Sequence, residues 1–207
     1  MRKFFLLAWL TLPVIGLAYH MGPGQVRLRL DEASSLAEVG ESHARAAAEL
    51  DERSAPAEWA KAEEAFEAAL DVLPAEYVQE RRALRLEHSK ARMFVSELPE
   101  ANEELAALVG ELDSDPQADP ELLREARRAY ASSQYYITWL MRLEGRTRAD
   151  WEPEIELSRQ LYKLIALEAE ESGDADQERV AREDLESAVR LARMDIEELQ
   201  GLPLPSQ

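Results

Sequence analysis

Apolar residues return at steps of three and four along most of this chain, the spacing that keeps them on one face of an α-helix. Proline, glycine and short acidic turns interrupt the pattern at intervals. Short links between successive helices favour antiparallel neighbours, stacked as helical hairpins. The pattern therefore predicts an all-α fold of about seven helices, over residues 31–53, 57–73, 75–97, 99–112, 120–144, 150–171 and 176–199.

Two of the predicted helices differ in how much apolar surface they carry. The helix over 120–144 is apolar around most of its circumference, so we expect it to lie at the centre of its domain. Asp119 is a good N-cap for this helix, and Gly145 is suited to end it. The helix over 31–53 has a narrow stripe, which we expect to be its buried face: Leu36, Val39, His43, Ala47 and Leu50.

Breaks in the pattern predict how the chain is divided. Residues 22–30 begin with Gly-Pro-Gly and then alternate apolar and basic residues, which favours a short extended spacer. A helical repeat domain is predicted over 31–200, with a possible internal boundary at the acidic, proline-containing loop 113–119. The proline-containing residues 201–207 are predicted to be an extended tail.

The first residues of the chain predict export. Arg2 and Lys3 precede an apolar run from Phe4 to Ala18, a pattern typical of a signal segment over residues 1–21. Both a signal peptide cleaved near Ala18 and an uncleaved anchor in the cytoplasmic membrane fit this pattern. Either interpretation places the rest of the chain in the periplasm or cell envelope, with any membrane association made only through residues 4–20.

Composition narrows the choice of partner. The 207 residues include 42 acidic and 24 basic side chains, for a formal net charge of −18. Such a chain has few cations to exchange for the counterions of nucleic acid, so no nucleic-acid partner is predicted. The chain contains no cysteine, which excludes disulfides, thiolate metal sites and thiol nucleophiles.

One stretch has the spacing of a known repeat. Ala62, Phe66, Ala69 and Pro74 follow one another at intervals of four, three and five residues. This resembles the second-helix half of a tetratricopeptide repeat, in which small residues let helices approach and an aromatic ring fills the groove between them. About ten extra residues lengthen the unit relative to the usual 34. Weaker echoes occur upstream at Leu36, Val39, Gly40 and His43, and downstream at Ala126, Tyr130 and Ser133.

The resemblance implies a peptide-binding or assembly scaffold with a concave groove, although no binding residues of the family can be carried over to this chain. A basic stripe on the predicted helix 75–97 offers one candidate site, because Arg81, Arg85, His88 and Arg92 are spaced four, three and four apart. Arginine forks bind carboxylates well, so this stripe suggests a protein or peptide partner that is acidic. The alternative is salt bridging to neighbouring acidic helices.

An aromatic cluster offers a second candidate site. Tyr135, Trp139 and Trp151 lie close in sequence and could line a groove that grips a peptide or glycan. The alternative is that these rings form the packed centre of a helical domain.

Catalytic motifs do not appear in the sequence. Its three histidines are not in metal-ligand spacing, and no P-loop, nucleophile elbow or dinucleotide fingerprint occurs. We therefore expect no catalytic residues, no metal and no cofactor. The favoured hypothesis is an exported interaction scaffold without catalysis. A self-associating structural bundle is the alternative, and an enzyme of unrecognised type is a third possibility.

Overall fold

The computed structural model describes residues 23–51 and 54–200, and these form eight α-helices. Because these two ranges contain no strand, the all-α prediction is confirmed for them. The predicted signal or anchor at 1–21 and the predicted tail at 201–207 lie outside the described residues. The helices are α2 (Pro23–Glu49), α3 (Ala55–Val72), α4 (Val78–Arg92), α5 (Leu98–Ser114), α6 (Pro120–Leu143), α7 (Arg148–Ser172), α8 (Ala175–Arg193) and α9 (Ile196–Gln200).

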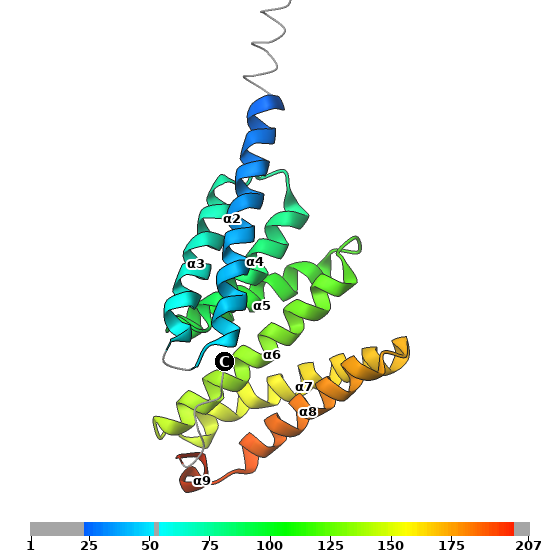
Figure 1. Ribbon diagram of the computed structural model, residues 1–207. Helices are drawn as coiled ribbons and strands as arrows, with labels where there is room; N and C mark the ends of the chain where they lie inside the picture. The colour runs from blue at the N-terminus through cyan, green and yellow to red at the C-terminus, as the bar shows by residue number, and fades with distance from the viewer. Residues whose placement is uncertain (1–22, 52–53, 201–207) are drawn as a thin grey trace, which may run out of the picture.

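Successive helices turn back on one another and pack in sequence order from α2 to α8 (Figure 1). Helices α2 to α5 form one half of the molecule and α7 to α9 the other, with α6 crossing between them (Figure 1). Residues 115–119 join α5 to α6, which share one hydrophobic cluster. The predicted boundary at 113–119 is therefore a turn between packed neighbours and does not separate two cores.

Helix α6 holds the two halves together. Its Ala126 and Ala129 are buried with residues of α4 and α5. Its Ala131 and Trp139 are buried with residues of α7 and α8. The expectation that this apolar helix lies at the centre of the fold is confirmed. Its predicted N-cap is also confirmed, because the Asp119 carboxylate accepts a hydrogen bond of 2.9 Å from the Glu121 backbone N–H.

The extended spacer predicted for 22–30 is wrong, because α2 already begins at Pro23. Proline is well suited to the first turn of a helix, where its missing N–H costs no hydrogen bond. Leu30, Ala33 and Ala37 follow one another at steps of three and four residues, as on one face of a helix. The alternation of apolar and basic residues over 26–30 obscures this spacing. The alternation was too short to indicate a strand.

The buried face of α2 is also different from the predicted stripe. Val39, and Leu50 just beyond the helix, are each 45% exposed, whereas Ala33, Gly40 and Ala47 are buried. Small side chains let α2 lie close to α3, where the fully buried ring of Phe66 fits against the helix. A Cβ added at Gly40 would lie 2.7 Å from the Phe66 ring, so this position accepts no larger residue without a shift. The buried stripe is Ala33, Gly40, Ala47 and the partly buried Ala37 and Ala44.

The predicted final helix, 176–199, is divided into α8 and α9. Arg142 of α6 is buried and donates hydrogen bonds to the carbonyl oxygens of Leu191 and Met194, at the end of α8. The Asp195 carboxylate accepts a hydrogen bond of 2.7 Å from the Glu198 backbone N–H, which starts a new turn. These contacts end α8 and begin α9.

We predict that Gly40→Ala lowers the free energy of unfolding by about 1–3 kcal/mol, because the added Cβ overlaps the Phe66 ring in a packed interface. In an open helix the same change is favourable, because glycine is about 1 kcal/mol less stable than alanine. Gly110 of α5 provides that control, since a Cβ there meets nothing within 4 Å. Urea unfolding should move the midpoints of the two variants in opposite directions, and equal shifts would contradict the close contact.

Candidate functional site

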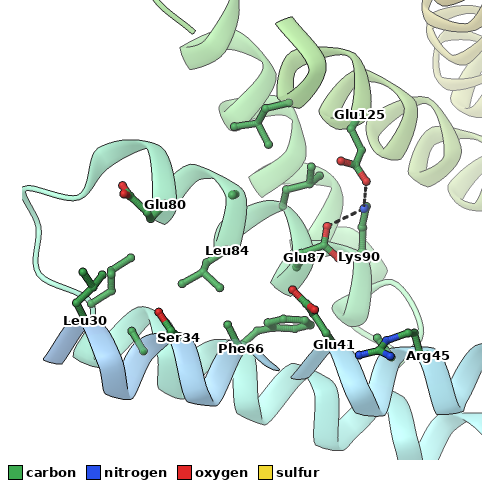
Figure 2. A pocket seen from close by; sticks show the side chains of 17 residues that line it. Leu30, Ser34, Glu41, Arg45, Phe66, Glu80, Leu84, Glu87, Lys90 and Glu125 are labelled. Carbon is green, nitrogen blue, oxygen red and sulfur yellow. Dashed lines mark hydrogen bonds and ion pairs between the residues drawn. The ribbon is translucent and has the colours of Figure 1, made fainter. Parts of the chain in front are cut away.

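A groove of about 640 Å³ lies where α2, α4 and the start of α6 face one another. Its floor and walls are largely apolar. Leu30 comes from α2, Phe66 from α3 and Leu84 from α4, and all three line the hollow (Figure 2). Short side chains on two of the facing helices, such as Ala37 and Ala83, leave the space between them open. A concave, mostly apolar surface with a few polar groups is typical of binding sites.

The charged residues around the groove are mainly acidic. Lys90 donates to the Glu87 carboxylate at 2.8 Å and also to Glu125, so it is held between α4 and α6 (Figure 2). Burial lowers the pKa of Lys90, but the two carboxylates outweigh this effect and leave the pKa above its usual value. Four carboxylates and two cations line the groove, so it carries an excess of negative charge: Glu41, Glu80, Glu87 and Glu125 against Arg45 and Lys90.

The predicted basic stripe lies on a different part of α4. The guanidinium group of Arg81 donates to the carbonyl oxygens of Leu70, at 3.3 Å, and Leu73, so it binds the end of α3. His88 lies 3.0 Å from the Glu63 carboxylate, also on α3. These two members of the stripe therefore fasten α4 to α3.

The other two members of the stripe also have partners within the chain. Arg85 donates to Glu104 at 2.5 Å and to Glu111 at 2.6 Å, both on α5. Arg92 donates to Glu97 at 2.7 Å, in the turn before α5. Arg85, His88 and Arg92 thus pair with carboxylates, as the salt-bridging alternative expects. Arg81 is held by backbone carbonyl oxygens instead. The acids come from α3, α5 and the turn before α5.

Arg82, next to the stripe, makes the most buried of these ion pairs. Its side chain is 8% exposed and donates to Glu111 at 2.7 Å and Asp115 at 2.6 Å. The hydrogen bonds from Arg82 and then Arg85 hold the pKa of the Glu111 carboxyl below its ordinary value. The cations of α4 that face α5 are therefore neutralised inside the protein.

The predicted aromatic site is part of the core. Trp139 and Trp151 are 5% and 9% exposed and belong to the cluster formed by α6, α7, α8 and α9. Tyr135 packs against this cluster and lies 6.1 Å from Trp139 between ring centroids. Arg142 covers the Trp151 ring at 4.9 Å from its centroid. Packing between the four helices covers Trp139 and Trp151, whereas Tyr135 stays half-buried at the edge of the cluster.

Sequence reasoning missed the groove, although signals for it were present. Glu80, Ala83, Leu84, Glu87 and Lys90 follow the helical spacing of three and four, on a face of α4 turned away from the basic stripe. The small residues of α2 pointed to the close approach of α2 and α3. What the sequence alone did not provide was the packing order that leaves this face of α4 open.

No group of three or more histidine or acidic side chains within 23–51 and 54–200 is arranged to hold a metal ion. None of the helices in these ranges is both long enough and apolar enough to cross a membrane. No protein-family model matches the sequence, and no curated protein is significantly similar to it.

The ion pairs between α4 and α5 predict a specific dependence of stability on pH. Because the pKa of Glu111 is lowered in the folded state, its ionised form stabilises the fold above the unfolded value of 4.5. That contribution is lost as the pH falls from this value through the lower, folded pKa. We expect Glu111→Gln to reduce the free energy of unfolding at pH 7 and to differ progressively less from the wild type below pH 4.5.

Urea unfolding at a series of pH values measures this difference. Glu103→Gln is a matched control, since Glu103 is an exposed acid on the same helix. It should change stability little at any pH. A Glu111→Gln variant as stable as the wild type at pH 7 would show that the pairs with Arg82 and Arg85 contribute no net stability.

Proposed function

We propose that this protein is an exported interaction scaffold that binds a segment of a partner protein in the groove between α2, α4 and α6, without catalysis. The observation that carries the proposal is the groove itself, which is apolar inside and ringed mainly by carboxylates. Its lining offers surfaces for apolar contact and charged groups for orientation. Such a surface binds by complementarity of shape and charge.

The charge of the groove favours a partner segment with apolar residues and at least one basic residue. Glu41 and Glu80 are exposed at the groove, while the groove's Lys90 is already bound by two carboxylates. The basic stripe suggested an acidic partner, but its four residues are paired within the chain. An approaching cation would therefore meet an unbalanced negative potential, which speeds association and favours the correct orientation.

The resemblance to a tetratricopeptide repeat supports the same function. Ala62, Phe66 and Ala69 are fully buried, and Gly40 receives the Phe66 ring at the close contact that small residues permit in such repeats. The additional residues lengthen the two helices on either side of the turn between α2 and α3. We propose that α2 to α8 form a short array of such hairpins, whose first, third and fifth helices present the groove.

Export is the second part of the proposal. Arg2, Lys3 and the apolar run 4–18 support a signal or anchor that delivers the domain to the outer side of the cytoplasmic membrane. The groove begins at Leu30 of α2, within about ten residues of that segment. An anchored form would hold the groove close to the membrane surface, within reach of envelope proteins.

Site-specific photo-cross-linking of the full-length chain in its native cells tests the proposal. Ala83 of α4 is exposed and lines the groove, so a photoreactive residue there should cross-link to one partner protein. Ala107 of α5 is also exposed but does not line the groove, and it is the matched control. Mass spectrometry should identify a cross-linked peptide that combines apolar and basic residues.

Three outcomes would contradict the proposed docking. Equal cross-linking at Ala83 and Ala107 would show that contacts at the groove are not specific. An acidic peptide at Ala83 would reverse the charge argument. A second copy of this chain at Ala83 would favour the self-associating bundle, because the groove would then be a contact between subunits.

A further inference from the structure

A second pocket of about 570 Å³ continues the groove toward α8. It shares Lys90 and Glu125 with the first groove, so the ion pair between these residues lies between the two hollows. One side is aromatic, because the rings of Trp59 and Phe94 stack with 4.3 Å between their centroids. The full lining is Trp59, Lys90, Met93, Phe94, Glu121, Arg124, Glu125, Arg128, Ala129, Ser132 and Gln177.

Hydrogen-bond donors without partners distinguish this pocket from the first. The indole Nε1 of Trp59 is buried and finds no acceptor among the described residues. Two nitrogens of Arg128, Nε and Nη2, are likewise buried and unpaired within that part of the chain. Buried donors are satisfied in the great majority of protein sites, and a ligand that supplies acceptors would satisfy these three.

The other cations of the pocket are already engaged. Arg124 donates to Glu121 at 2.8 Å and to Gln177 at 3.0 Å. Lys90 is held by Glu87 and Glu125. Arg128 is therefore the one lining cation that forms no ion pair with any residue the structure describes.

Asp184 of α8 lies close enough to Arg128 for the two charges to interact. Burial raises the pKa of the Asp184 carboxyl, and the positive charge of Arg128 opposes that rise. The two groups do not form an ion pair within the described structure, although the charge of Arg128 acts on Asp184. Arg128 thus lines the pocket as a cation without a salt-bridge partner among the described residues.

We propose that this second pocket binds an acidic side chain that lies beside a large apolar residue of the partner segment. The carboxylate would accept hydrogen bonds from Arg128 and from the Trp59 indole, and the apolar residue would lie against the Trp59–Phe94 pair. The inference rests on the proposed function, since both pockets belong to one continuous face.

The two pockets together would fix the direction of the bound segment. Its basic residues would lie at the acidic end, near Glu41 and Glu80 of the first groove. Its acidic residue would lie at the Arg128 end. A segment bound in reverse would place like charges together at both ends, which is how charge patterns enforce specificity.

Blocked dipeptides are suitable probes for the pocket. We would titrate acetyl-Phe-Glu-amide and acetyl-Phe-Gln-amide into the full-length chain in detergent. The indole N–H signal of Trp59 would be followed by NMR and identified with a Trp59→Phe variant. We expect this signal to move toward the shift of a hydrogen-bonded indole with the glutamate peptide, and the glutamine peptide to bind about tenfold more weakly.

Two arginine variants test the assignment further. Arg128→Gln should reduce binding of the glutamate peptide to the level of the glutamine peptide, and Arg128→Lys should fall between the two. Arg146→Gln is the control, because Arg146 is an exposed arginine in the turn after α6. It should leave binding unchanged.

Equal affinity of the two peptides for the wild type would overturn the inference whether or not the variants fold. So would tighter binding of acetyl-Phe-Gln with a free terminal carboxylate, which would assign the pocket to a chain end. Failure of the dipeptides while cross-linking at Ala83 persists would overturn this inference alone. If no partner cross-links at Ala83 while the dipeptides still bind, the proposed docking in the first groove would be contradicted instead.

Discussion

The pairing of the α4 arginines with carboxylates of α5 determines which face of α4 stays open. Arg82 and Arg85 both bind Glu111, and Arg82 also binds Asp115, so the cationic side of α4 is turned inward and neutralised. A nearly buried guanidinium needs such partners, because an unpaired charge in that place would be costly. Once that side is committed, the face of α4 that carries Ala83, Leu84 and Glu87 is left beside α2 and α6. The groove therefore lies on the side of α4 that is not committed to α5.

Helix α6 extends this arrangement across the molecule. It is buried on one side against α4 and α5 and on the other against α7 and α8, so it fixes the two halves relative to one another (Figure 1). Near its start it supplies Glu125 to the first groove and Arg128 to the second pocket. One helix thus borders both the acidic groove and the pocket that contains Arg128. Close contacts at small residues of α2, such as Gly40 against the Phe66 ring, hold α2 in place as the opposite wall.

Local patterns in the sequence predicted the helices better than they predicted the site. Caps and turns are local, so Asp119 and Pro120 placed the start of α6 correctly. The division of α8 from α9 depends on contacts from Arg142, some 50 residues away. Helical periodicity is a local pattern and cannot predict such a contact. The stripe of Arg81, Arg85, His88 and Arg92 was found, but whether it faces a partner or α3 and α5 depends on packing order. Trp139 and Trp151 were ambiguous for the same reason, since an aromatic residue at helical spacing fits a core and a groove equally well.

The groove is proposed to bind the partner, and the basic stripe to stabilise the fold. The most direct test uses the partner peptide identified at the groove and measures its dissociation constant for Ala83→Arg and Arg85→Met. We expect Ala83→Arg to weaken binding about tenfold at unchanged stability, because it adds a cation to an exposed position that a basic segment approaches. We expect Arg85→Met to lower the free energy of unfolding and to keep the dissociation constant within about twofold of the wild type. A folded Arg85→Met variant that no longer binds, beside an Ala83→Arg variant that still does, would show that the stripe and not the groove holds the partner.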